Sequence, residues 1–469
     1  MNIFVFNKAL RLNDNTTLIE QIKNEKNIIP FFIFTEQINK KKNEYYSQNS
    51  VQFMCESLLD LENEIKKYNG KLYFFHSNNF INVFKELKNI NSIGTNFDYS
   101  PYAINRQNIL KEFCSKNNIK FYIYEDHVLY NILDDKTLKK DGKPYTVFTP
   151  FKNHCKNNLD VSKPNKFNKF IFLKNKELEN NKYYISKIID YDENENINIH
   201  GGRSNGLLIL KNIKKFKDYK LKRDYLTYNT TFLSAHNHFG TLSIREIYKK
   251  MLKYKLDNLI EQLIWRDFYY NLYYHNPHML DGQLKSQSKK FNNEENKSFK
   301  PKYDKIKWLN DKILFNKWCT GNLGIPICDA GMRQLNNTGF MHNRLRMICA
   351  NILTKLLLIS WRWGEKYFAT KLIDYDCIQN SAGWQWTCCG IDPQQVFRIF
   401  NPQIQNVKFD SECIFIKKYI SELENVSNED IYNWEKSYIK YTNINYVSPS
   451  LDYKKSRENG IKEFKKINK

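Results

Sequence analysis

The chain has 469 residues and a mass of 56.4 kDa, which exceeds one ordinary hydrophobic core and indicates two or three domains. Hydrophobic residues make up 41% and charged residues 26%, the balance of a folded protein, so wholesale disorder is excluded. The formal net charge of +23 favours a polyanionic partner, nucleic acid or an anionic membrane, with a basic surface that has no such partner as the alternative.

No apolar run approaches the ~20 residues that a membrane-spanning helix needs. The first residues, MNIFVFNKALRLNDN, lack the charged and apolar blocks of a secretory signal. The ten cysteines are scattered and form no CxxC pair, so the sequence predicts neither a disulfide framework nor a metal site. We therefore expect an intracellular protein, in the cytoplasm or the nucleus, with reduced thiols.

The first 130 residues alternate short apolar runs with amphipathic stretches such as 51–68. This rhythm predicts an α/β domain at 1–130 with a Rossmann-like parallel sheet covered by helices. No GxGxxG follows the first run, so a standard dinucleotide site is not expected there. The predicted strands are Ile3–Phe6, Ile28–Phe34, Leu72–Phe75, Ser92–Phe97 and Phe121–Tyr124.

Beyond residue 130 the pattern changes twice. Residues 131–200 are polar, rich in Asn and Lys and poor in periodicity, which predicts an inter-domain connector on the surface. Residues 201–450 show helical periodicity and contain every tryptophan, so we expect an all-α domain there. Residues 451–469 are strongly basic and are expected to form a partly frayed tail.

Two helical stretches carry polar and aromatic side chains outside their apolar faces. In 257–275, Gln262, Trp265, Arg266 and Tyr269 share one stripe, which suits stacking on a base and holding a phosphate. In 339–359, Asn343 and Met347 lie four residues apart and share a side. Arg344 and Arg346 point to different sides, so one could meet a phosphate and the other an internal carboxylate. The alternatives are ordinary packing residues and a solvated basic face.

Segment 360–398 concentrates Trp361, Trp363, Trp384 and Trp386, with Asp374, Asp376 and Asn380 between them. Indoles are the side chains most easily oxidised by one electron, so a row of them beside a redox cofactor could carry charge, although tryptophans also pack cores. The hydroxyls of Thr230, Thr231 and Ser234 precede a predicted helix and suit a phosphate, or they cap that helix.

Several motifs in order resemble the photolyase/cryptochrome family: FNKALRLNDNTTL, LIWRDFYY, GFMHNRLRM, WRWGEKYF, AGWQW and FRIFNPQIQNVKFD. The resemblance covers nearly the whole chain and implies an α/β domain followed by a helical domain that binds FAD. It further implies that UV-damaged DNA lies on a basic face with the damaged dinucleotide flipped into a central cavity. At positions 343, 347 and 386 the chain has Asn, Met and Trp, and in this it resembles the class I photolyases that repair cyclobutane pyrimidine dimers.

By the same resemblance, each motif residue receives an expected role. Arg346 would pair with Asp374, Asn380 would face flavin N5, and charge would pass from Trp384 through Trp361 to Trp308. Trp265 and Trp386 would form the walls of the lesion pocket, with Asn343 and Met347 as its floor. The remaining FAD contacts would be Tyr219, Thr230, Thr231, Phe232, Leu233, Ser234, Tyr375 and Asp376. The DNA contacts would include Arg223, Gln262, Arg266, Tyr269, Arg344, Gln405 and Lys408.

The implied reaction is light-dependent DNA repair, in which reduced FAD lends one electron to the dimer and receives it back. Position 262 has Gln, where the enzymes that repair cyclobutane dimers usually have Glu. This difference predicts that the dimer is split less efficiently and that the lesion class is unchanged. The alternatives are a (6-4) photolyase, which Gln262 alone favours, and a cryptochrome-type light receptor. The Asn-Glu pair with which the family binds folate is not evident in the segment NFDYSPYAINRQN. The sequence therefore leaves open whether an antenna chromophore is bound and whether it is folate or deazaflavin. We expect a monomer without a metal.

Overall fold

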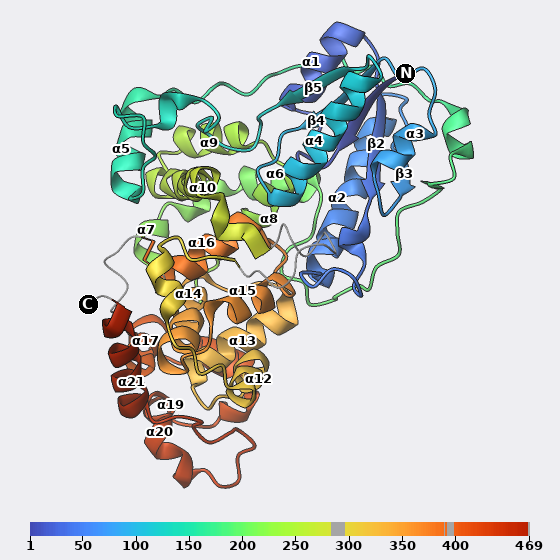
Figure 1. The fold of residues 1–469 in the computed structure, drawn as a ribbon. Helices are drawn as coiled ribbons and strands as arrows, with labels where there is room; N and C mark the ends of the chain where they lie inside the picture. The colour runs from blue at the N-terminus through green and yellow to red at the C-terminus, as the bar shows by residue number, and fades with distance from the viewer. Residues whose placement is uncertain (283–295, 389, 392–397, 468–469) are drawn as a thin grey trace.

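The computed structural model describes residues 1–282, 296–388, 390–391 and 398–467. Its first part is an α/β layer and its second part is helical, so the predicted fold class is confirmed (Figure 1). No helix in the described ranges is both long and apolar enough to cross a membrane.

The sheet contains six strands in the order β5-β4-β1-β2-β3-β6. The central strand β1 pairs in parallel with β2 and β4, placing Ile3 beside Ile29 and Ile93. The strands are β1 (Asn2–Phe6), β2 (Ile29–Phe34), β3 (Tyr73–His76), β4 (Ser92–Asn96), β5 (Lys120–Tyr124) and β6 (Tyr184–Ile185). The helices between them are α1 (Thr16–Glu25), α2 (Gln48–Lys66), α3 (Ile81–Lys85) and α4 (Pro101–Lys116).

Strands β1, β2 and β4 are buried along their whole length because both faces of the sheet are covered, and β1 and β2 are almost entirely apolar. Phe4 and Phe6 of β1 lie in one hydrophobic cluster, whereas Ile3 and Val5 lie in another, as the alternation of side chains across a strand requires. The helix starts are capped locally, for example by Asn15, whose side chain accepts from the backbone N–H of Leu18.

The segment 131–200 is more ordered than its polar composition predicts. It contributes helix α5 (Phe148–Asn158), and its strand β6 pairs antiparallel with β3, so the sheet is mixed at this edge. Helix α5 packs on α10 (Asp257–His275), since Phe148 and Phe151 are both buried there. The connector therefore forms part of the structure around α10.

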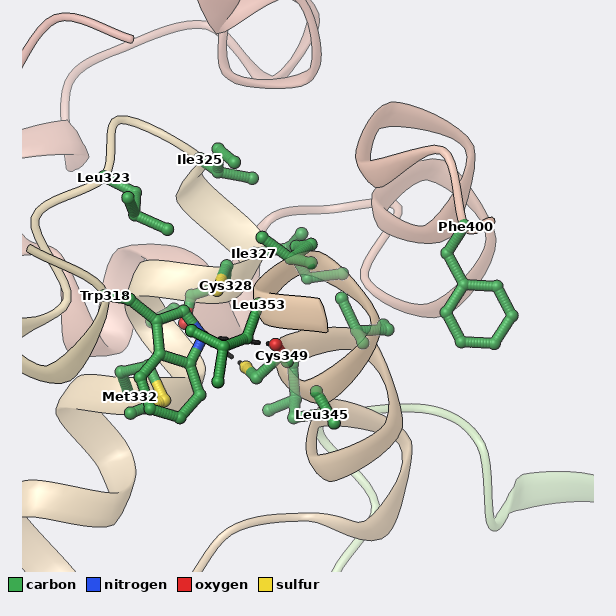
Figure 2. Packing of buried hydrophobic residues seen from close by; sticks show 14 of the residues in the cluster. Trp318, Leu323, Ile325, Ile327, Cys328, Met332, Leu345, Cys349, Leu353 and Phe400 are labelled. Carbon is green, nitrogen blue, oxygen red and sulfur yellow. Dashed lines mark hydrogen bonds between the residues drawn. The ribbon is translucent and has the colours of Figure 1, made fainter. Parts of the chain in front are cut away.

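The helical part is built around a core of short helices. In Figure 2, Trp318 lies among Cys328, Met332 and Leu345, and its indole Nε1 donates to the backbone oxygen of Cys349 at 3.1 Å. The helices before α10 are α6 (Arg203–Lys211), α7 (Tyr219–Lys222), α8 (Ser234–Phe239) and α9 (Ile244–Lys253). Those after it are α12 (Lys312–Thr320), α13 (Pro326–Thr338), α14 (Asn343–Asn351), α15 (Trp361–Ala369), α16 (Cys377–Cys388), α17 (Pro402–Phe409), α18 (Ile414–Tyr419), α19 (Asn428–Tyr432) and α20 (Trp434–Ser437).

The basic segment expected to fray forms helix α21 (Tyr453–Ile467) over its described residues, at the outer edge of the helical part (Figure 1). Gly460 lets the helix approach the π-helical turn Ile352–Leu356, because a Cβ there would lie 2.0 Å from the backbone oxygen of Lys355. Phe464 is buried and meets the ring of Trp308 edge-on, with centroids 6.2 Å apart. Two close-packed positions therefore order a helix whose composition is mostly lysine and polar.

A buried set of charges joins the two parts of the chain. Arg11 and Asp126 lie 2.6 Å apart, and Arg245 of α9 lies 2.9 Å from Asp14 and also pairs with Asp126. The side chains of Arg11, Asp14 and Asp126 are almost inaccessible and that of Arg245 is 11% exposed; Arg11 also donates to the backbone oxygen of Gly240. We call Arg11, Asp14, Asp126 and Arg245 the charged seam. Its pairing offsets the cost of removing these ions from water.

Candidate functional site

Helix α14 presents the two side chains that the sequence pattern places together. The side-chain nitrogen of Asn343 lies 3.9 Å from Sδ of Met347, and Asn343 is exposed while Met347 is half-buried. His342 caps the helix by accepting from the backbone N–H of Arg344. An amide beside a thioether offers both hydrogen bonds and a soft apolar surface to a ligand.

The same helix also carries Arg346, which turns inward. Its Nη2 donates to both carboxylate oxygens of Asp374 at 3.0 and 3.1 Å, and its Nε donates to the backbone oxygen of Met341. Arg344 instead faces Asp224 at 2.7 Å and lies over the ring of Phe409. The two arginines therefore diverge, as their spacing predicts, and Arg346 takes the internal carboxylate.

Asn380 of α16 is held by a carboxyl group that the sequence reasoning did not identify. Its side-chain nitrogen donates to both the backbone oxygen and Oε1 of Glu365, at 3.0 Å each. Glu365 is buried on α15, and burial raises the pKa of its carboxyl to about 7. With its nitrogen engaged, Asn380 can offer only its amide oxygen to a ligand. An acidic residue inside WRWGEKYF is the one sequence signal that could have indicated Glu365.

Asp376 lies at the start of α16 but faces the α/β domain. Its carboxylate accepts from the backbone N–H groups of Ile378 and Gln379, from Tyr270 and from His238. Lys8 lies 3.9 Å away. Although burial opposes ionisation, the hydrogen bond from His238 and the Lys8 charge hold the pKa of Asp376 well below its ordinary value. These partners compete with the flavin contact implied by the family resemblance.

The three tryptophans expected to carry charge differ in exposure. Trp384 and Trp361 are buried, at 3% and 0% exposed, whereas Trp308 is half-buried at the surface beneath α21. Trp384 lies against Gly364, where a Cβ would come within 2.1 Å of its Cη2. Trp308 is therefore the most exposed of the three, and the exposures do not rank the two buried indoles in the order expected for charge transfer.

Trp265 of α10 is covered on one face by a residue from the connector. The ring of Phe148 is stacked on it with centroids 3.6 Å apart and an interplanar angle of 10°. Lys152, one turn further along α5, lies over Phe148 and pairs with Glu261 of α10 at 3.0 Å. Only the other face of the indole is left for a ligand. The aperiodic composition of the connector gave no sign of this contact.

The expected phosphate and DNA residues are spread over several elements. Thr230, Thr231 and Phe232 are half-buried, Leu233 is buried and Ser234 is exposed. Tyr219 is half-buried near Arg223, and its pKa is raised by burial. Tyr375 stacks on Tyr45 with centroids 6.2 Å apart.

Arg223 and Lys408 are exposed, as a DNA contact requires, whereas Gln405 is buried. Arg266 turns away from this stripe and donates to the backbone oxygen of His127. Tyr269 packs beside Trp265, and Gln262 donates to the backbone oxygen of Asn258 at 3.3 Å. The stripe inferred from the sequence is therefore split, with Arg266 at the boundary between the two parts of the chain.

Packing between helices links the elements that carry these side chains. Helix α16 packs against α10, α14 and α15, so Trp265, Asn343, Asn380 and Trp386 come from one packed group. We call Trp265, Asn343, Met347 and Trp386 the lesion cluster. No group of three or more His, Cys, Asp or Glu residues suitable for a metal ion occurs in the described part of the chain.

Several buried polar atoms near the lesion cluster lack a hydrogen-bond partner among the described residues. They are the indole Nε1 of Trp386, which belongs to the cluster, and Nε2 of His342 and Nε of Arg344, which flank Asn343. Buried polar groups are rarely left unsatisfied, so these atoms indicate that a polar ligand or ordered water completes the region. Together with the Arg346–Asp374 pair and Asn380, they fit a polar planar cofactor such as FAD.

Comparisons with known proteins agree with this arrangement. Residues 259–466 match the family described as FAD binding domain of DNA photolyase, and residues 2–168 match the family described as DNA photolyase. A deoxyribodipyrimidine photo-lyase of Buchnera aphidicola is 34% identical over 99% of this chain and 96% of its own length. The chain therefore contains both halves of a known two-part protein, with the FAD-binding half covering α10 to α21.

Solved structures give the same result. A photolyase from Sulfolobus tokodaii containing two FAD molecules is 34% identical, with a TM-score of 0.83 over 99% of this chain and 100% of that one. A cryptochrome from Synechocystis, 22% identical with a TM-score of 0.82 over 98% of both chains, shares the fold. With its sheet, its helical domain and its near-full-length relatives in agreement, this chain belongs to the DNA photolyase family.

Proposed function

We propose that this protein repairs cyclobutane pyrimidine dimers in DNA by using light. The observation that carries the proposal is the pairing of Asn343 and Met347 on α14, which packs on α16, the helix of Trp386; α16 in turn packs on α10, the helix of Trp265. An amide suits the polar edges of a pyrimidine pair, and indoles suit its faces. The basic charge of the chain supports DNA as the source of the lesion.

FAD, when bound and reduced, would supply the single electron that starts bond cleavage in the dimer. Around it, Arg346 and Asp374 would hold the polar edge of the ring system, because their mutual pairing fixes both side chains. Asn380 would present its amide oxygen, since Glu365 occupies its nitrogen. The residues 230–234 and Tyr219 are proposed to bind the remainder of the cofactor.

The buried indoles would connect the site to the surface. Trp384 and Trp361 lie inside the helical core, and Trp308 lies at its edge, so a charge formed on the first can leave through the last. The apolar surroundings of Trp384, which include Phe368 with its ring centroid 5.0 Å away, would keep water from this indole. This relay would reactivate the cofactor rather than split the dimer.

The lesion class rests on Asn343 and Met347. Both lie on α14 with Asn343 open to solvent, so a flipped pyrimidine pair can reach them. Gln262 is the feature that favours the alternative, a (6-4) photolyase. An amide can donate a hydrogen bond to the lesion but cannot transfer its proton as a carboxylic acid can, so we expect slower splitting and the same lesion class.

The test is a repair assay under blue light. The purified and photoreduced protein is incubated with an oligonucleotide containing one thymine dimer and with a matched (6-4) oligonucleotide. Repair of the first alone supports the proposal, and repair of the second alone establishes the alternative. A flavin-free protein, or a flavoprotein that repairs neither, contradicts it and in the latter case favours a cryptochrome-type receptor.

The same preparation tests the remaining expectations. Its absorption spectrum shows whether a second chromophore, folate or deazaflavin, accompanies the FAD. Gel filtration at several concentrations tests the proposed monomer. Because DNA is the proposed substrate, we further propose that the protein acts inside the cell, which a fractionation experiment checks.

A further inference from the structure

A dense run of positive charge extends from the last residue of α6 to Arg223, before the predicted FAD-binding residues 230–234. Its members are all exposed, and Asp218 is the one acidic residue among them, paired with Lys222 at 3.3 Å. We call this run the lysine strip. It consists of Lys211, Lys214, Lys215, Lys217, Lys220, Lys222 and Arg223.

The lysine strip is held on a firm base. Ile213 and Phe216 alternate with its lysines and are 0% and 4% exposed, within the same hydrophobic cluster as α10. These two anchors force the intervening lysines outward. The strip is therefore a constrained surface, in contrast to a flexible charged tail.

The strip also joins the helices that carry the lesion cluster and the expected DNA contacts. Immediately after it, Asp224 pairs with Arg344 at the start of α14, and the backbone N–H of Leu226 donates to the oxygen of Phe409 at the end of α17. A duplex placed over Asn343 and Lys408 would therefore pass close to Arg223 and continue along the strip. Figure 1 shows α7 at the same edge of the molecule as α14 and α17.

We propose that the lysine strip binds the phosphate backbone of duplex DNA that flanks the lesion, and so enlarges the binding site beyond the lesion pocket. The inference rests on the proposed function. Lysine ammonium groups are point charges without base-reading geometry, so the added binding is independent of sequence and of damage. It releases counterions, which gives it a strong dependence on salt.

The experiment compares two variants that lose equal charge. In the first, Lys214, Lys215, Lys217 and Lys220 of the strip are changed to Gln. In the second, four exposed connector lysines beside Phe170 and Phe172 of the α/β domain are changed to Gln: Lys163, Lys166, Lys169 and Lys174. Binding is measured from low to moderate salt with a dimer-containing duplex of about one helical turn (~10 bp) and with one extended by about a turn on each side.

For the extended duplex, we expect the strip variant to reduce the slope of log affinity against log salt by roughly 2 to 4, because each phosphate that is no longer neutralised removes about 0.9 from the slope. The connector variant should keep the wild-type slope, and the short duplex should show a smaller difference. Equal slopes for both variants on the extended duplex would overturn the proposal. If the wild-type protein repairs the dimer while the two variants have equal slopes, only the proposal for the lysine strip is contradicted. If the wild-type protein repairs nothing, the proposed function is contradicted. Retained DNA slopes with weakened binding to anionic vesicles would assign the strip to a membrane instead.

Discussion

The charged seam is buried and the lesion cluster is half-buried to exposed, and their hydrogen bonds differ as well. In the seam, Asp126 accepts from Arg11, Arg245 and Thr16, so its carboxylate oxygens are occupied. Around the lesion cluster, the indole Nε1 of Trp386 and Nε2 of His342 have no partner among the described residues. The seam is complete without any other molecule, whereas the cluster is not.

This difference separates groups that hold the fold from groups that await a ligand. A satisfied ionic network resists change, because removing one member leaves another charge buried. A buried polar atom without a partner carries a free-energy cost that a bound ligand or an ordered water removes. Four substitutions test this distinction: the first removes a seam carboxylate, and the other three change side chains in or next to the candidate site.

Asp126→Asn should have the largest effect, because it leaves the almost inaccessible guanidinium of Arg11 without its main partner. We expect a loss of about 3–5 kcal/mol in the free energy of unfolding, measured with urea and circular dichroism. The control is Lys42→Gln, which removes an exposed pair with Glu36 and should cost less than about 1 kcal/mol. Equal losses in both variants would show that the seam does not join the two domains energetically.

Glu365→Gln tests a carboxyl whose pKa burial raises from 4.5 to about 7. Below pH 4.5 the wild-type group is neutral in the folded and unfolded states alike, so the raised pKa carries no penalty. As the pH rises towards 7 the unfolded state loses its proton first, and wild-type stability falls. The side chain of the Gln variant is neutral at every pH. Between pH 4.5 and pH 8, the free energy of unfolding of the variant should therefore rise relative to that of the wild type by up to about 3 kcal/mol. A parallel pH profile for the two proteins would contradict this.

Phe148→Ala should weaken binding of dimer-containing DNA by roughly tenfold, because Trp265 loses the ring that holds it flat. Phe151→Ala is the control: Phe151 is equally buried on α5, and its ring partners among the described residues are Tyr145 and Phe268. Both variants should lose about 3–5 kcal/mol of stability, so affinity is compared at a temperature where both stay folded. If both variants lost the same affinity for dimer-containing DNA, Phe148 would have no role beyond packing.

Gln262→Glu should produce the smallest change. A carboxylic acid can donate a stronger hydrogen bond to the charged dimer, so we expect the quantum yield of repair to rise by roughly twofold. Glu261→Gln provides the control, since the neighbouring side chain pairs with Lys152 instead of facing the lesion cluster. A lower yield for Gln262→Glu would count against the role given to this residue.

The local pattern of the sequence predicted the elements better than their contacts. Strands and amphipathic helices show in the sequence because burial repeats every second or fourth residue. The pairing of Arg11 with Asp126 spans 115 residues, and the stack of Phe148 on Trp265 joins two separate domains of the prediction, so neither leaves a local signal. The order of α21 was missed for a similar reason, because Gly460 and Phe464 act through contacts with Lys355 and Trp308.

The candidate site was found mainly through motif resemblance. Helical spacing alone placed Asn343 beside Met347 and separated Arg344 from Arg346, which the structure shows. Spacing could not reveal that Asp376 and Arg266 face the α/β domain, since that depends on where the domain docks. Glu365 was missed because a single acid in an aromatic segment reads as an exposed residue.

The close contact between Gly364 and Trp384 has a consequence for how this protein can change over time. With no atom beyond the α-carbon at position 364, the main chain of α15 itself is the surface on which the indole rests. Even a methyl group would push the ring from its place. The position of Trp384 is thus set by the backbone of α15, so substitutions among surface side chains can change the exterior without displacing this indole.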